Sequence, residues 1–361
     1  MGYAYGSRPD TLGITRSEIR PMSIIHIQDL SKHFKVLNRR QGLSGSLRDL
    51  FSGDYRLVKA VDGISYDIEP GEMVGYIGPN GAGKSTTIKM MTGILKPTSG
   101  TILVNGQPPY ANRIHQARIM GVVFGQRTQL WWDLPVIESF KILKDIYKVD
   151  QKTFNEHMQL FNDLVGLQAL YSQQVRTLSL GQRMLCDISA SFLHNPRVVF
   201  LDEPTIGLDV SVKAKIRSVI QELNRTRNTT ILLTTHDLGD VEALCQRIII
   251  LDRGRVLYDG GIKKVNALFG AYRILKVQID NYSPTVQISL REKLAQRFGP
   301  GTNITVAESE ESWTDVTIDQ ARTPLSDILS LVMSSFSVSD VRIVEISMET
   351  VVRKIYDGAL L

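Results

Sequence analysis

The stretch Gly78–Ser85 has the sequence GPNGAGKS; it follows the apolar run Met73–Ile77 and precedes a helical pattern over Ser85–Met91. It matches the pattern G-x-x-x-x-G-K-[ST] in full, in the strand-to-helix context that the pattern requires. The glycines let backbone N–H groups turn inward around phosphate oxygens, and the positive N-terminal end of the next helix points at the same charge. This stretch therefore predicts a strand, a loop and a helix that bind nucleotide phosphates.

The charged and hydroxyl residues of this loop have distinct expected roles. Lys84 is expected to reach the β- and γ-phosphates of ATP, and the Ser85 hydroxyl to ligate Mg²⁺. The other predicted nucleotide-binding residues here are Gly78, Asn80, Gly81, Gly83 and Thr86.

A pair of acids follows a second apolar run. Val198–Leu201 ends in Asp202 and Glu203, just before Pro204. Asp202 is placed to hold the Mg²⁺ shell, and Glu203 to polarise the attacking water as a general base, since in-line attack needs a proton acceptor opposite the leaving group. Taken alone, the pair could equally be two solvated acids that open a turn. Beside a complete phosphate loop, the catalytic interpretation is favoured.

Strand-like and helical patterns alternate around these motifs. Several apolar runs are nearly continuous in Val, Ile and Leu, as in parallel strands that are covered on both faces. These runs are Met120–Phe124, Val198–Leu201, Ile231–Thr234 and Ile248–Leu251. Helical patterns such as Val210–Asn224 lie between them, and residues 136–195 are mostly helical in pattern. The fold class predicted is α/β with a helical lobe.

The pattern changes after Gly270 to β-α-β-β-α-β, the order of a ferredoxin-like domain. The predicted elements are, in chain order, Tyr272–Ile279, Ser289–Arg297, Asn303–Ala307, Trp313–Ile318, Pro324–Ser335 and Val341–Ile346. An amphipathic helix, Met348–Tyr356, is expected to close the chain. We find no catalytic constellation here, so an accessory role is expected.

Composition narrows the class of protein. The 361 residues carry a net charge of +5, which permits contact with an anionic surface but gives no indication of a nucleic-acid partner. The two cysteines, Cys186 and Cys245, have no metal-binding spacing and fit a reducing compartment. No apolar run approaches the roughly 20 residues needed to span a bilayer. Membrane association would then come through a partner or an amphipathic patch.

Five further features carry a family resemblance. Leu178–Gln182 has the sequence LSLGQ at the start of a helical pattern and resembles the signature of ABC ATPases, usually Leu-Ser-Gly-Gly-Gln. Gly207–Asp209 resembles the D-loop of that family, and Thr234–Asp237 resembles the strand end that bears its switch histidine. Gln126 matches the Q-loop and Phe34 the A-loop aromatic residue. All occur in the family's order, so the chain is identified as a member of the ABC ATPase family.

The resemblance implies the fold and the domain boundaries. It implies a P-loop NTPase core with an antiparallel β-subdomain and a helical lobe, plus the small C-terminal α+β domain. We expect a loose arm over residues 1–21, an ATP-binding domain over residues 22–270 with its helical lobe at about 136–195, and an accessory domain over residues 271–361.

The resemblance also implies roles in trans. In ABC ATPases two subunits sandwich two ATP molecules head to tail. Ser179 and Gly181, with Gln182 beside them, would then meet the γ-phosphate of the nucleotide on the other subunit, and Asp209 would tune the interface. Leu180 departs from the usual glycine, which puts the fit to the opposing nucleotide in question, although the neighbouring motif residues remain.

Other roles implied by the resemblance act in cis. His236 would sense the γ-phosphate, and Gln126 would touch the metal or water and link it to a membrane partner. Phe34 would stack on adenine; a core aromatic is an alternative role for it, and Tyr55 is a competing stacking residue. A histidine at a strand end, such as His236, is often structural when taken without the family context.

Transport is the function that these features favour. The chain has one cassette, no zinc motif and no heptad array, unlike ABC ATPases of DNA repair and translation. Trp131 and Trp132 follow Gln126, where the family contacts its membrane subunit; they could equally fill a junction inside the domain.

The segment Leu37–Val58 looks inserted and carries a short amphipathic helical pattern at Leu43, Leu47, Leu50 and Phe51. That insertion resembles one in polysaccharide exporters, or is a surface helix packed on its own domain.

The group with the strongest resemblance is the ATPases of ABC-2 type exporters, related to sodium, drug or viologen efflux. This implies a homodimer that binds separate integral membrane permeases at the cytoplasmic face of the inner membrane. An envelope polysaccharide or lipid exporter and a non-transport regulatory ATPase are the alternatives.

Overall fold

The computed structural model describes residues 23–37, 55–125, 127–235, 237–265, 272–280, 283–299, 305–308, 313–320, 323–345 and 356. The chain divides into two compact units, residues 1–236 with 251–256, and residues 237–250 with 257–361. Several predicted features lie outside the described residues: the N-terminal arm, the insertion helix, Gln126, His236 and nearly all of the closing helix.

The central sheet is built from the predicted apolar runs. Strand β7 pairs in parallel with β6 and with β3, and β6 pairs in parallel with β5. The full order is β5-β6-β7-β3-β8-β9. The strands are β3 (Met73–Ile77), β5 (Met120–Phe124), β6 (Val198–Asp202), β7 (Thr230–Thr234), β8 (Arg247–Asp252) and β9 (Arg255–Gly261). Because parallel strands present their carboxyl ends at one edge, the predicted phosphate loop and acids emerge together.

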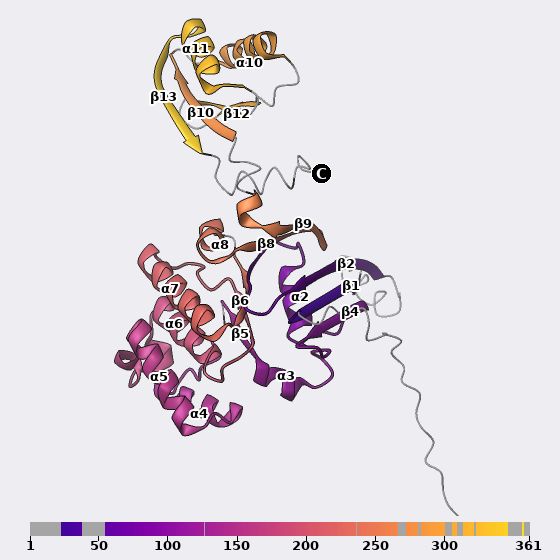
Figure 1. Ribbon diagram of the computed structural model, residues 1–361, viewed down its shortest axis with the longest axis vertical. Helices are drawn as coiled ribbons and strands as arrows, with labels where there is room; N and C mark the ends of the chain where they lie inside the picture. Colours follow the sequence, from indigo (N-terminus) through magenta and orange to yellow (C-terminus); the bar gives the residue numbers. More distant parts are fainter. Residues whose placement is uncertain are drawn as a thin grey trace, which may run out of the picture. The chain divides into compact units, whose positions relative to one another are not determined.

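A second sheet is antiparallel, as the family resemblance implied. It has the order β2-β1-β4, from β1 (Ile25–Leu37), β2 (Tyr55–Ile68) and β4 (Ser99–Val104) (Figure 1). Strand β1 pairs with β2 as far as Leu37 but with β4 only as far as Ser31. The ends of β1 and β2 therefore form a two-stranded ribbon beyond the third strand.

Helices occupy the stretch that the sequence predicted to be mostly helical. It contains α4 (Val136–Tyr147), α5 (Gln151–Val165) and α6 (Leu180–Ser191), with 3₁₀ turns between α5 and α6. Phe140 and Phe161 are fully buried in it, each contributing a large apolar area to the core. Helix α5 ends at Gly166, whose φ of +70° allows the chain to turn there.

Other described helices precede the C-terminal sheet. They are α2 (Lys84–Met91), α3 (Arg113–Ile119), α7 (Val210–Arg227) and α8 (Leu238–Leu244). Helix α7 covers the predicted range Val210–Asn224 and buries Ile216, Val219 and Leu223, one apolar stripe at helical spacing. Of the helices in the described ranges, none is both long and apolar enough to span a bilayer.

The C-terminal sheet has the predicted ferredoxin-like order. Its strands run β11-β12-β10-β13, all antiparallel, and two helices lie on one face (Figure 1). The elements are β10 (Tyr272–Ile279), α10 (Pro284–Phe298), β11 (Thr305–Glu308), β12 (Trp313–Asp319), α11 (Leu325–Ser335) and β13 (Val338–Glu345). Leu275, Leu290 and Ile328 meet in its core.

One helix there begins earlier than expected. Helix α10 starts at Pro284 rather than Ser289, because Ser283 caps it and proline is well suited to the first helical position.

Candidate functional site

A cavity of about 750 Å³ brings the two predicted motifs together. Asn80 and Ser85 of the phosphate loop line it from one side, and Asp202 and Glu203 at the end of β6 line it from another. Lining residues that the sequence did not single out are Lys89, Ile94, Phe124, Gly125, Arg127 and Ile206. The cavity thus holds the loop, the acids and the residues on either side of position 126.

The phosphate loop needs its glycines for space as well as for conformation. Gly83 has a φ of +105°, and a Cβ there would lie 2.5 Å from the Ala60 carbonyl oxygen. A Cβ on Gly78 would lie 2.7 Å from the Leu251 carbonyl oxygen. Side chains at either position would force the backbone away, so the loop packs against its neighbours only with glycine there.

Lys84 is the buried cation of the site, with 7% of its surface exposed. Its Nζ donates hydrogen bonds to the carbonyl oxygens of Gly78 (2.5 Å) and Pro79 (3.2 Å) within its own loop. Burial lowers the pKa of Lys84, whereas the nearby Glu203 and Asp202 carboxylates raise it. An ammonium group held by weak neutral acceptors is well placed to exchange them for phosphate oxygens.

The turn at Gly254, just before β9, is hydrogen-bonded to the phosphate loop. The Gly254 N–H donates to the Ala82 carbonyl oxygen (3.0 Å), and the Asp62 N–H donates to the Gly254 carbonyl oxygen (2.9 Å). Two backbone hydrogen bonds therefore connect the phosphate loop through this turn to β2.

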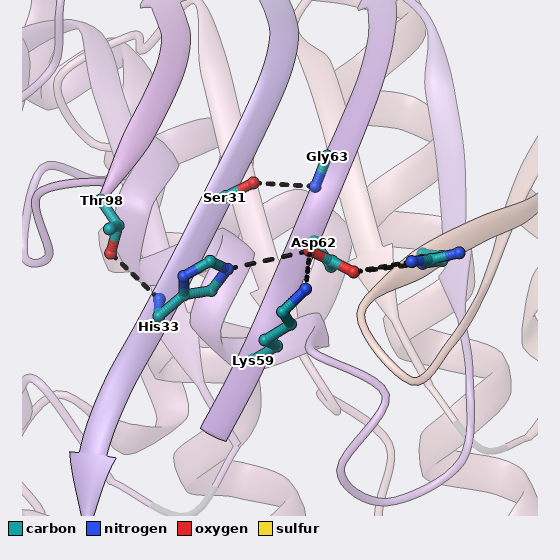
Figure 2. Close-up of polar contacts among 7 residues, drawn as sticks. Ser31, His33, Lys59, Asp62, Gly63 and Thr98 are labelled. Atoms are coloured by element: carbon teal, nitrogen blue, oxygen red, sulfur yellow. Dashed lines mark hydrogen bonds and ion pairs between the residues drawn. The ribbon is translucent and has the colours of Figure 1, made fainter. Parts of the chain in front are cut away.

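The Asp62 side chain adds charge to this connection (Figure 2). Its carboxylate accepts a hydrogen bond from Arg255 Nη2 (2.9 Å) and lies 3.3 Å from Lys59 Nζ and 3.8 Å from His33 Nε2. Hydrogen bonds from Arg255 and Lys59 lower the pKa of Asp62. Strand β2 is thus joined to the turn and the start of β9 by an ion pair as well as by backbone hydrogen bonds.

Thr234 orients both acids and was not predicted. Its buried hydroxyl donates to Asp202 Oδ1 (2.5 Å), and the Glu203 N–H donates to the Thr234 carbonyl oxygen (2.9 Å) and hydroxyl (3.2 Å). Glu203 has a φ of +54°, a left-handed backbone that is uncommon outside glycine. The register of β6 with β7, which pairs Asp202 with Thr234, is the signal that could have identified Thr234.

The oxygen ligands present suit a nucleotide-bound Mg²⁺. The Ser85 hydroxyl and the Asp202 carboxylate line the same cavity. Within the described ranges, no three His, Cys, Asp or Glu side chains gather into a metal site. Mg²⁺ usually retains waters and binds through one or two protein oxygens plus substrate phosphates, so this donor set fits that mode.

The predicted signature residues form the start of α6. Ser179 caps the helix: its hydroxyl accepts from the Gln182 N–H (3.2 Å), and the Gln182 side chain accepts from the Ser179 N–H (2.9 Å). A Cβ on Gly181 would lie 2.8 Å from Val212 Cγ1 of α7. Gln182 therefore supports the cap, and Gly181 allows two helices to approach closely.

The D-loop segment lies beside the signature. Asp209 caps α7 by accepting from the Val212 N–H (2.9 Å) and the Ser211 hydroxyl (2.7 Å), and these bonds lower the pKa of Asp209. A Cβ on Gly207 would lie 3.5 Å from Leu180 Cδ2, and Leu180 is 38% exposed. Ser179, Gly207 and Asp209 are exposed and form one edge, whereas Gly181 is buried. None of the predicted signature and D-loop residues is among the described residues that line the cavity.

The aromatic candidates lie on the β1–β2 ribbon. Phe34 is half-buried, with Lys32 Nζ 5.3 Å from its ring centroid. Tyr55 begins β2 and is more exposed. Neither is among the described residues lining the cavity, so the structure does not bring Phe34 to the loop and acids.

Two other predicted nucleotide-binding residues lie in or next to the phosphate loop. Thr86 lies in α2 and is half-buried, and Gly81 lies in the turn of the phosphate loop.

A buried acid adjoins the segment after position 126. Asp187 of α6 is 4% exposed and accepts through Oδ1 from the Thr128 hydroxyl (2.8 Å) and the Gln129 N–H (3.0 Å). Burial raises the pKa of Asp187 to about 6, against the lowering effect of those bonds and of Arg183. Sequence pattern alone did not identify this residue.

A Lys-bearing phosphate loop that shares a cavity with strand-end carboxylates, on a parallel sheet beside an antiparallel one, defines a P-loop ATPase. Residues 61–206 match the family model described as ABC transporter. The chain is 31% identical over 215 residues to the ABC transporter ATP-binding protein NatA of Bacillus subtilis (strain 168), covering 60% of this chain and 87% of NatA. This chain therefore belongs to the family of ABC transporter ATP-binding proteins.

Two further similarities agree. The Nod factor export ATP-binding protein I of Cupriavidus metallidurans is 34% identical over 200 residues, which are 55% of this chain and 65% of that protein. A solved dimeric structure of the ATP-binding cassette MJ0796, in a post-hydrolysis state bound to ADP and Pi, matches with a TM-score of 0.54 at 22% identity. It covers 66% of this chain and 98% of the cassette, and shows the shared fold.

Thr234→Val should remove the hydrogen bonds that the Thr234 hydroxyl makes to the Asp202 carboxylate and the Glu203 N–H, because valine keeps the shape of threonine but lacks the hydroxyl. We expect kcat for ATP hydrolysis to fall about tenfold, equivalent to roughly 1.4 kcal/mol, and the Mg²⁺ concentration for half-activity to rise. Thr234→Ser should retain both values near wild type. Steady-state ATPase assays with titrated Mg²⁺ would measure both effects, and wild-type values for the valine variant would contradict the role.

Gly181→Ala should destabilise the domain by about 1–3 kcal/mol, because the new Cβ would overlap Val212. Adding Val212→Ala should recover most of that loss, and Val212→Ala alone is the control. Thermal unfolding would measure the three variants. Equal loss in the single and double variants would contradict the contact.

Asp187→Asn should change how stability depends on pH. A folded pKa of about 6, above the usual aspartate value, means that the stability contribution of Asp187 is full below about pH 4 and is lost as pH rises through 6. The free energy of unfolding of the variant, relative to wild type, should therefore increase between pH 4 and pH 7.5, by up to about 3 kcal/mol. Urea denaturation at the two pH values tests this, and a pH-independent difference would exclude it.

Proposed function

We propose that this ATPase drives an ABC exporter as an ATP-sandwich homodimer, bound at the cytoplasmic face of the inner membrane to separate ABC-2 type permease subunits. The observation that supports a dimer is that the phosphate loop and its acids lie apart from the signature and the D-loop. The cavity joins Ser85 with Asp202 and Glu203, whereas Ser179 and Asp209 lie at helix N-termini on a different, exposed edge. A second copy would supply that edge to the nucleotide.

The chemistry within one subunit follows from the cavity. Lys84 would bind the β- and γ-phosphates, and Glu203 would accept the proton of the attacking water. Ser85, Asp202 and Gln126 would hold Mg²⁺, which when bound neutralises charge that develops on the phosphates. Thr234 keeps Asp202 and the Glu203 backbone in register for those roles.

Other predicted residues would recognise the remaining parts of ATP. Gly78, Asn80, Gly81, Gly83 and Thr86 would complete the phosphate loop. Phe34 would stack on adenine from the β1–β2 ribbon, and His236 would bond the γ-phosphate and register its loss.

The second subunit would close over the nucleotide. The hydroxyl and helix N-terminus at Ser179 suit a γ-phosphate. Gly181 is buried against Val212 of α7, and would act by keeping these two helices close together. Gln182 would act by holding the Ser179 cap, since its side chain is already used there. ATP binding would close the dimer and hydrolysis would reopen it, which makes the chemistry a mechanical switch.

Two observations support a membrane partner. Trp131 and Trp132 are 37% and 48% exposed, and large exposed aromatics often anchor protein interfaces. The similarity to a protein named for Nod factor export favours export as the direction. We further propose that residues 22–270 form the ATP-binding domain, with the helical lobe at about 136–195, and that residues 271–361 form an accessory domain.

Glu203→Gln tests this proposal, because it removes the proton acceptor and should trap the ATP-closed dimer with its partners. The full chain would be captured from membranes in Mg-ATP, with Lys84→Ala/Glu203→Gln as the matched control that loses ATP binding. We expect polytopic permeases with the single variant and none with the control. Permeases of glycan or lipid export would favour that cargo. Soluble dimer alone, ribosomes or nucleic acid would instead favour a regulatory ATPase.

A further inference from the structure

One face of helix α6 is joined to the segment Thr128–Trp132 at two points. Arg183 and Asp187 are four residues apart, so they lie on the same face of the helix. Asp187 accepts the Thr128 hydroxyl and the Gln129 N–H, and its backbone carbonyl accepts from the Gln129 side chain (2.9 Å). The start of the segment is therefore held by three hydrogen bonds.

Arg183 holds the far end of the same segment. Its guanidinium carbon lies 5.4 Å from the ring centroid of Trp132, within the range of cation–π attraction. Between the two points, the Leu130 N–H donates to the Thr128 hydroxyl (3.1 Å), which orders the turn. The indole of Trp132 is thus exposed on one side and in contact with α6 on the other.

The same helix carries Ser179 as its N-cap. Arg183 lies about one helical turn from that cap, and Asp187 about two turns, roughly 12 Å along the axis at 1.5 Å per residue. Because the intervening backbone is continuous α-helix, a displacement of the 128–132 segment that moves these two side chains also moves Ser179.

We propose that Arg183 and Asp187 form a mechanical link between the exposed tryptophan pair and the Ser179 end of α6. The inference rests on the proposed function, in which the tryptophans face a permease and Ser179 meets the nucleotide of the other subunit. Both are positioning residues, since neither lines the cavity among the described residues. The link starts in the connection between β5 and α4, which also contains position 126, but it reaches the nucleotide of the other subunit through α6.

The burial of a charged group supports this role. Asp187 is almost fully buried and its pKa is raised, so its ionised form costs stability in the folded protein. A neutral side chain of similar volume would fill the space at lower cost. Retaining a carboxylate here gains strong, directional bonds to the segment, which a link that transmits force requires.

The test uses the full chain carrying Glu203→Gln and Trp313→Phe, so that emission comes only from Trp131 and Trp132. Light scattering reports ATP-driven dimerisation, and iodide quenching of tryptophan emission reports the 128–132 segment. In this parent we expect Mg-ATP to cause both dimerisation and a change in quenching. Adding Arg183→Met and Asp187→Ala should leave dimerisation intact and reduce the quenching change about threefold or more, since both attachments are lost.

Two further variants keep the result decisive. Thr128→Val removes a single hydroxyl and should reduce the quenching change by a smaller amount, and it decides the question if the double variant does not fold. Lys141→Met, an exposed cation on the neighbouring α4, is the matched control and should change nothing. An undiminished quenching change in the double variant, or in Thr128→Val when only that variant folds, would overturn the link.

The outcomes separate the two proposals. A parent that dimerises with ATP but shows no change in quenching leaves the dimer standing and overturns the link. A parent that does not dimerise overturns the proposed dimer and the link with it.

Discussion

The arrangement of the site depends on one buried cation. The Lys84 ammonium lies almost out of contact with water, bonded to carbonyls of its own loop and sensing two carboxylates across the cavity. Burying a charge is costly, so the surroundings must hold the loop rigidly enough to keep its acceptors in place. The glycine positions, the turn at Gly254 and the ion pairs of Asp62 all serve that requirement. The antiparallel sheet therefore supports the phosphate loop through β2 and the turn at Gly254, although none of its described residues lines the cavity.

Much of the fold followed from patterns that are local. Continuous Val, Ile and Leu runs located the parallel strands within a residue or two, because a strand that is buried on both faces needs apolar side chains at nearly every position. The β-α-β-β-α-β order of the C-terminal domain was likewise readable from alternation. What local pattern missed is set by a cap: α10 starts earlier than predicted because of Ser283 and Pro284.

The candidate site divides in the same way. The phosphate loop and its acids could be predicted because their chemistry is confined to short contiguous stretches. Thr234 and Asp187 could not, since each acts through a partner remote in sequence: a residue paired across β6 and β7, or a segment nearly sixty positions away. Gln182 shows a different limit. Its motif predicts a nucleotide contact, whereas in the folded chain its side chain is engaged in capping the helix. Residue type and spacing identify a site, but only tertiary register assigns each atom its partner.

The left-handed backbone at Glu203 also limits how this protein can evolve. Strand β6 ends and the chain reverses at that residue, with its N–H directed at β7. β-branched residues are strongly disfavoured in that conformation, whereas asparagine, aspartate and glycine tolerate it. Asparagine or glycine at position 203 would keep this backbone conformation but remove the carboxylate that lines the cavity.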